Sequence, residues 1–130
     1  MKEDWKDYYR EGLAYCRTAL AAGSRKEKFG TVVLYNLIGL ALENMLTGII
    51  MKDGEMPEHS GVGSMLQILE KKHEMPLSFK EESRFFNKFM NFCSLDVTFR
   101  DDPSADDIDR HLSFLSSVLR WSEGVVGPKD

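Results

Sequence analysis

The stretch of residues 32–51 constrains this chain most, because it is apolar on nearly every side of a helix. It is also long enough to cross a bilayer, so its few polar residues decide its setting. Asn36, Glu43 and Asn44 lie inside it, and a carboxylate at mid-membrane is costly. We therefore expect no membrane span. The stretch is typical of the central helix of a helical bundle, with Leu40 among its buried side chains.

Helical spacing recurs through the rest of the chain, and no run of residues alternates convincingly with the period of a strand. Short loops between these segments predict an all-α, five-helix up-and-down bundle in which sequence neighbours pack antiparallel. Ser24 and Ser78, each with Glu three residues later, are expected to start helices, and Ser104 with Asp107 offers a weaker version. The five helices are expected near residues 3–22, 25–53, 61–73, 79–95 and 105–123.

Length and composition indicate one ordinary domain. A chain of 130 residues has room for one core, so we expect a single domain over 1–123 and a flexible tail over 124–130. The formal net charge of -4 disfavours broad binding to a phosphate backbone. Cys16 and Cys93 fall in apolar helical patterns and are expected to be core thiols. The acidic, aromatic N-terminus is unlike a secretory signal, so a cytoplasmic location is expected.

A polar stripe runs along the apolar stretch. Asn36, Gly39, Glu43 and Thr47 recur at steps of three and four, so they share one helix face. In one interpretation this face touches solvent or packs closely on a neighbouring helix, with Gly39 allowing the approach. In the other, it faces a second copy of the protein or lines a shared cleft, and Asn36 and Glu43 are buried polar groups that need partners.

The residues from Tyr35 to Leu69 carry a family resemblance. An apolar helix containing Glu43 breaks at Lys52-Asp53-Gly54, and the loop that follows contains His59-Ser60-Gly61-Val62. This arrangement resembles the HEPN family of small helical domains. The resemblance implies a helical fold, a homodimer, and a gene often placed beside a minimal nucleotidyltransferase. It implicates Glu43, His59 and Arg100 as site residues.

The ribonuclease motif of that family is absent from this chain. HEPN ribonucleases place a His after an Arg with four to six residues between them. Arg100 is followed at those offsets by Ala105, Asp106 and Asp107, and His111 lies too far along. Arg110 and His111 are adjacent and are expected on different faces of a helix. The missing motif therefore argues against catalysis by this route.

His59 and its neighbours form the main candidate binding site. In one interpretation His59 or Ser60 caps the third helix. In the other, His59 contributes to a ligand cleft, with Ser60 and the amides of Gly61 and Gly63 as donors at a helix N-terminus. No His or Cys pair has the spacing of a metal site, so neither a metal nor a cofactor is expected. The candidate ligand-binding residues are His59, Ser60, Glu43, Asn36 and Arg100.

The expected function is a non-catalytic HEPN-type binding module, a homodimer that binds a nucleotide, an RNA or a protein partner. The alternative is a ribonuclease with a rearranged site, or the HEPN subunit of a nucleotidyltransferase toxin–antitoxin system. Eight Phe, seven Met, four Tyr and two Trp exceed what a small core readily holds, which favours an exposed apolar patch at a dimer interface. Phe85 and Phe89 are expected in that patch.

Overall fold

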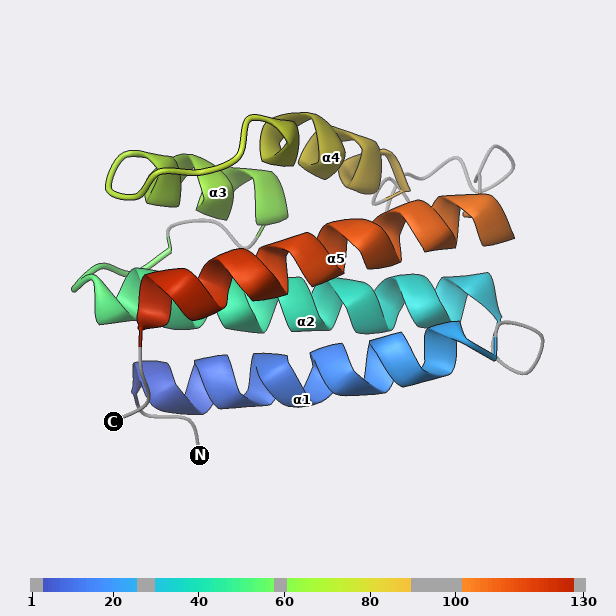
Figure 1. Ribbon diagram of the computed structural model, residues 1–130, viewed down its shortest axis with the longest axis horizontal. Coiled ribbons are helices and arrows are strands. Elements are labelled where there is room, and N and C mark those ends of the chain that lie inside the picture. Colours follow the sequence, from blue (N-terminus) through green and yellow to red (C-terminus); the bar gives the residue numbers. More distant parts are fainter. Residues whose placement is uncertain (1–3, 26–29, 58–60, 90–101, 128–130) are drawn as a thin grey trace, which may run out of the picture.

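The computed structural model describes residues 4–25, 30–57, 61–89 and 102–127. It confirms the all-α five-helix bundle, and these residues contain no strand (Figure 1). The helices are α1 (Trp5–Gly23), α2 (Thr31–Lys52), α3 (Val62–Glu70), α4 (Ser78–Asn87) and α5 (Ala105–Val126).

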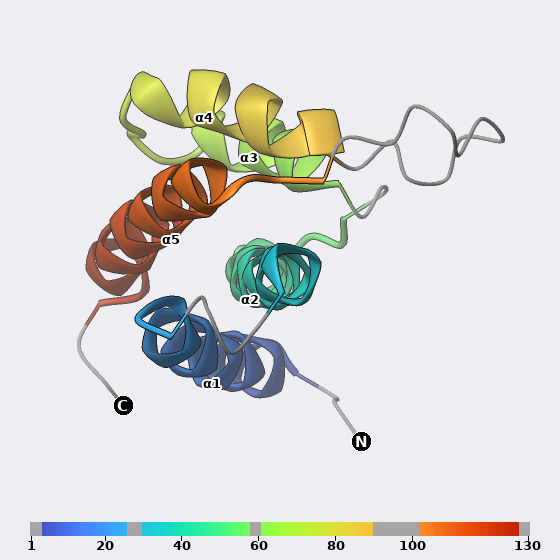
Figure 2. The same ribbon diagram turned by 90° about the vertical axis from the view of Figure 1, so that its right-hand side faces the viewer.

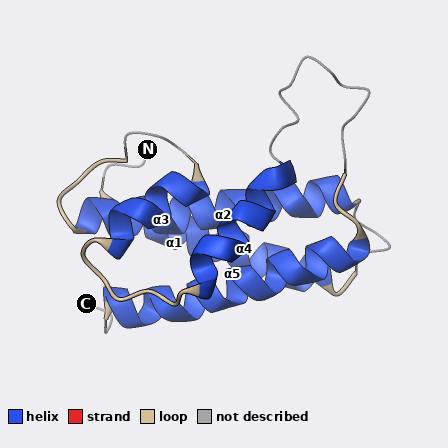
Figure 3. Cartoon of the chain, turned by 90° about the horizontal axis from the view of Figure 1, so that it is seen from above, coloured by secondary structure: helices blue, strands red, loops and turns tan. Residues whose placement is uncertain are grey.

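Three long helices and two short ones form two layers. The long helices α1, α2 and α5 lie side by side, and α2 packs against both of the others. Figure 2, which looks roughly along these helices, shows α3 and α4 together on the far side of α2 and α5 from α1. Figure 3 shows α4 lying across the direction of α5. The short helices therefore form a separate layer, in which α3 rests on α2 and α4 rests on α5.

The α2 helix lies at the centre of the core, as its sequence predicts. Ten of its residues are buried, namely Leu34, Tyr35, Ile38, Ala41, Leu42, Met45, Leu46, Gly48, Ile49 and Ile50. It is the one described helix long and apolar enough to cross a membrane. The expectation for Leu40 was wrong, because its side chain is 42% exposed on the outer edge of α2. An all-round apolar pattern does not reveal which side of a helix faces outward.

Glycines bring α1 and α2 into backbone contact. A methyl group added at Gly48 would lie 2.8 Å from the Tyr9 amide nitrogen and 2.9 Å from the Trp5 carbonyl oxygen. At Gly12 it would lie 2.5 Å from the amide nitrogen of Met45. The expected role of Gly39 is not seen, since a methyl group there would make ordinary contact with Phe86, at 3.6 Å. The close approach therefore lies on the α1 side of α2.

The helix starts agree only in part with the capping patterns. Ser104 caps α5 in a complete capping box with Asp107, as its spacing predicts. Ser24 does not start α2: its backbone is helical, and its hydroxyl donates to the Ala21 carbonyl at the end of α1. An N-cap residue needs an extended backbone. Gly30 caps α2 instead. Ser78 is already helical, and Leu77 precedes it without a side-chain cap bond.

Two further helix ends differ from the expected boundaries. The α3 helix ends at Glu70, because residues 71–77 form a loop that is fixed to other elements. The α5 helix continues to Val126, and the partly buried Val125 and Val126 pack against the core. The part of the expected fourth helix beyond residue 89 lies outside the described residues, and so does Cys93.

Candidate functional site

The sequence-predicted site residues divide into two groups. Asn36 and Glu43 lie on α2, where Asn36 is exposed and Glu43 is half-buried. His59, Ser60 and Arg100 lie outside the described residues. The residue that directly precedes α3 is Gly61, which takes the N-cap position expected for His59 or Ser60. The structure therefore describes two of the five predicted residues, both on one helix face.

The polar stripe of α2 faces partly inward. Burial raises the pKa of the Glu43 carboxyl, because a charged carboxylate loses water there. Burial also raises the pKa of the Tyr35 phenol, and the nearby Glu43 adds to the shift. Thr47 donates from its hydroxyl to the sulfur of Met65 on α3, at 3.6 Å. The end of the stripe at Thr47 therefore packs on a neighbouring helix, while Asn36 reaches solvent.

A groove with a mixed polar and apolar lining lies between α3 and α4. Its volume is about 340 Å³. Each helix contributes one polar stripe, and the loop between them contributes apolar side chains. The lining residues are Gly63, Ser64, Leu66, Gln67, Glu70, Met75, Pro76, Leu77, Lys80, Ser83, Arg84 and Asn87. Leu77, which is 94% exposed, lies in the loop before α4.

Helical spacing places the polar side chains of α4 in this groove. Lys80, Ser83, Arg84 and Asn87 recur at steps of three, one and three, so they share one face of the helix. Ser83 is buried, and its hydroxyl donates to the Lys80 carbonyl at 2.9 Å. A methyl group at Gly63 would lie 3.2 Å from the Asn87 amide nitrogen. The end of α4 therefore lies against the first turn of α3.

The groove carries positive charge that other described residues do not neutralise. Lys80 and Arg84 are exposed, and neither forms an ion pair within the described part of the chain. Glu70 is the one acidic residue in the lining. The groove also opens at the N-terminus of α3, where helical amides favour negative charge. An anionic group is therefore the ligand that this end of the groove suits.

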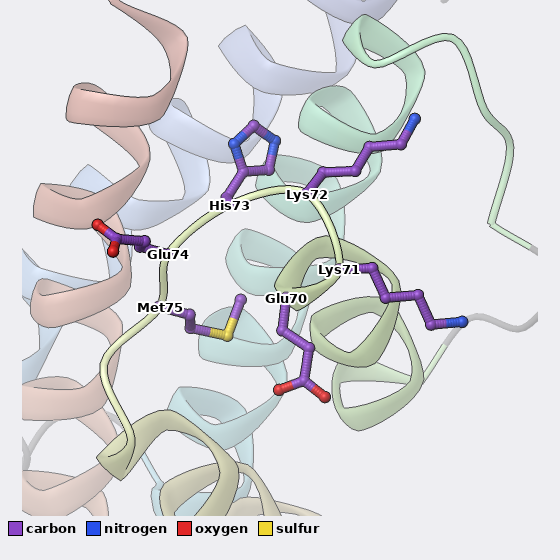
Figure 4. Close-up of a pocket in the computed structure, with 6 residues that line it drawn as sticks. All are labelled: Glu70, Lys71, Lys72, His73, Glu74 and Met75. Carbon is purple, nitrogen blue, oxygen red and sulfur yellow. The ribbon is translucent and has the colours of Figure 1, made fainter.

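The loop of residues 71–77 is fixed at the mouth of the groove. His73 lies 2.8 Å from the Asp53 carboxylate, and Lys72 lies 2.6 Å from that of Glu55. Trp121 on α5 donates to the Glu74 carbonyl at 2.8 Å. The loop borders a hollow of about 510 Å³, lined by residues 70–75. Their side chains spread around the loop without converging on one point (Figure 4), so they are not arranged to bind a ligand together.

His111 on α5 is the one buried polar side chain without a hydrogen-bond partner among the described residues. It is 1% exposed and lies among four aromatic rings, those of Tyr35, Phe85, Phe86 and Phe89. Its neighbour Arg110 is exposed and pairs with Glu82. The two adjacent residues thus lie on different helix faces, as predicted.

The expectation that Phe85 and Phe89 form an exposed patch was wrong, because both rings pack against His111. Phe89 is 8% exposed and Phe85 is half-buried. In the described part of the chain, the exposed large apolar residues are Val33, Leu40, Met56 and Leu77. Aromatic residues therefore pack inward more fully than their number suggests.

No known protein family, curated protein or solved structure matches this chain. The HEPN relationship therefore stays a prediction. Among the described residues, no group of His, Cys, Asp or Glu is arranged to hold a metal ion. Cys16 is buried, and burial raises the pKa of its thiol to about 11. That thiol stays protonated at neutral pH and is a poor nucleophile.

Sequence reasoning does not single out the groove residues, because the histidines and the family motifs point to other positions in the chain. Gly63, which the sequence indicates as a possible amide donor, lies in the first turn of α3 and lines the groove, while its role as a donor stays a prediction. The stripe of Lys80, Ser83, Arg84 and Asn87 has a signal that could have been found, because its spacing follows one face of a helix. That this face meets α3 is a tertiary fact, which spacing does not reveal.

Proposed function

We propose that this protein is a non-catalytic binding module and that a nucleotide binds in the groove between α3 and α4. The observation that carries the proposal is the presence of two cations, Lys80 and Arg84, in a cavity of about 340 Å³. Small-ligand pockets span about 300–1,000 Å³ and combine apolar lining with a few polar groups. A mononucleotide suits this size, whereas RNA needs a long basic surface, which a net charge of -4 disfavours.

The chemistry of the groove suits the two ends of a nucleotide. Asn87 lies against the first turn of α3, and Arg84 lines the groove one turn earlier on the same face of α4, so a phosphate there can accept from a guanidinium, an amide and helical N–H groups. Leu77, which is exposed, offers apolar surface to a base or ribose. In this pose the phosphate lies at the Arg84 end and the base lies toward the loop of residues 71–77.

The described histidines and cysteine support a binding role without catalysis. His111 is buried, His73 is paired with Asp53, and the thiol of Cys16 is buried. None of the three lines the groove. Purified protein should accordingly leave single-stranded RNA and tRNA intact in a gel assay. Cleavage that disappears in both Arg100→Ala and His111→Ala would overturn this part of the proposal.

Calorimetry with the four ribonucleoside monophosphates tests the binding site. At least one should bind, and Arg84→Gln should weaken its affinity about 10- to 100-fold, because a charge-assisted hydrogen bond contributes about 1.5–3 kcal/mol. The control is Arg17→Gln on the exposed face of α1, which changes the net charge by the same amount at a position far from the groove. Equal losses in both variants would show a general charge effect and no site.

The homodimer and the HEPN relationship form part of the same proposal. Val33, Asn36 and Leu40 lie on one exposed edge of α2, spaced by three and four residues. Exposed apolar side chains on a helix edge favour an interface between copies of the chain. A nucleotidyltransferase partner stays a prediction, which a nucleotidyltransferase gene beside this one would support.

A further inference from the structure

The His111 ring is held mainly by α4. Phe85 and Phe86 of α4, together with Phe89 just beyond its end, have ring centres 5.0–5.3 Å from that of His111. Tyr35 of α2 supplies the fourth ring, at 5.5 Å. Three of the four aromatic neighbours would therefore leave the imidazole if α4 moved away. Without them, the ring would reach water.

A protonated imidazole has no place in this cluster. The Nε2 atom of His111 is buried and has no hydrogen-bond partner among the described residues, so a proton added there would bring an unsolvated charge into an apolar site. The charged groups around it do not offer a compensating bond. Glu82 on α4 forms a two-bond pair with Arg110 of α5, and Lys88 lies over the Phe85 ring.

The remaining charged and titratable groups lie on α5 and α2. Asp107, one turn before His111, closes the capping box with Ser104. On α2, the Tyr35 hydroxyl donates to the Phe86 carbonyl at 2.6 Å, and the half-buried Glu43 lies about two helical turns beyond Tyr35. These groups are already bonded to others or lie away from Nε2. Protonation therefore favours any state in which the ring is exposed.

The same helix that covers His111 forms one wall of the groove. Its inner face carries the aromatic rings, and its other face carries Lys80, Ser83, Arg84 and Asn87. With ten residues, α4 is too short to be stable without packing. Loss of the aromatic contacts would therefore remove the wall along with them.

We propose that His111 makes the groove sensitive to pH: its protonation releases α4 from α2 and α5 and thereby lowers ligand affinity. The ligand in this regulation is that of the proposed function, so this part rests on the proposed function. The release of α4 rests on the aromatic cluster alone. A neutral His111 keeps α4 in place as a wall of the groove, and mild acid releases this helix.

The direction of the pH effect follows from the burial of His111. Burial lowers the pKa of His111 to about 4 in the folded chain; Asp107 and Glu82 act to raise this pKa, and Arg110 lowers it further. An exposed imidazole titrates near about 6.5, so the opened state takes up the proton first. The contacts of α4 are therefore at full strength above pH 6.5 and weaken as the pH falls toward 4.

Hydrogen exchange of the α4 amides, corrected for intrinsic rates, measures this opening. Their protection should fall about tenfold or more between pH 7 and pH 5, as the two pKa values require. In His111→Phe, and in the smaller His111→Leu, the fall should be lost, because neither side chain takes up a proton. Protection of α1, which lies apart from α4, should change little in any of the three proteins.

The same experiment with added ligand distinguishes this inference from the proposed function. Adenosine monophosphate should protect the α4 amides at pH 7, and its affinity should fall further toward pH 5 in the native chain than in the two variants. The variants also correct for titration of the phosphate itself. An equal fall of α4 protection in the native chain and both variants would overturn the inference. Failure of all four ribonucleoside monophosphates to bind at any pH would overturn the proposed function alone.

Discussion

Leu40 and Leu42 stand two positions apart in α2 and meet opposite surroundings. Leu42 is fully buried, whereas Leu40 is 42% exposed. Leu42→Ala should lower the free energy of unfolding by about 2–5 kcal/mol, because it leaves a cavity in the core. Leu40→Ala should cost less than about 1 kcal/mol, as for other surface changes. Urea denaturation of dilute samples measures both, and similar losses would contradict the described orientation of α2.

The difference between these two leucines marks the limit of sequence reasoning at the residue scale. The apolar run predicts that α2 is central, and ten buried residues confirm it. The apolar run has apolar residues on nearly every side of the helix, so it does not tell which edge stays exposed. The aromatic surroundings of His111 were not predicted for a related reason. The rings around His111 come from α2, α4 and the residue Phe89 just after α4, and no local pattern in α5 predicts them.

At the scale of elements, the packing of α1 on α2 depends on the absence of a side chain at Gly48. Gly48→Ala should destabilise the protein by about 1–3 kcal/mol, because the new methyl group meets backbone atoms of α1 and the helices must separate. The matched control is Gly124→Ala in α5, where no neighbour lies within 4 Å. That change should add up to about 1 kcal/mol of stability through helix propensity.

Thermal unfolding of both glycine variants provides the measurement. A stabilised Gly48→Ala protein would show that α1 and α2 are not in backbone contact.

Local sequence signals predict an element best where its own residues fix its ends. Ser104 and Asp107 cap α5 with their own side chains, as the sequence predicts. The start of α2 at Thr31, by contrast, follows a cap residue with no side chain, which leaves no such signal.

At the scale of the whole molecule, the exposed edge of α2 predicts self-association. Light scattering should give a mass above 14.9 kDa that rises with concentration, because burying Val33 and Leu40 against a second copy removes apolar surface from water. Leu40→Lys should return the mass to that of one chain with little loss of helix content. Leu77→Lys, in the loop before α4, is the control. A native mass that stays at 14.9 kDa would exclude the homodimer.

The contact of Trp121 with the loop of residues 71–77 gives the protein a natural optical reporter. The indole is hydrogen-bonded to Glu74 and lies 6.3 Å from the His73 ring and 5.8 Å from Phe79 of α4, measured between ring centres. The only other tryptophan, Trp5, lies on α1 with Lys52 over its ring. In a Trp5→Phe background, emission would come from Trp121 alone. Movement of the groove's mouth should then be visible as a change of fluorescence, without any attached label.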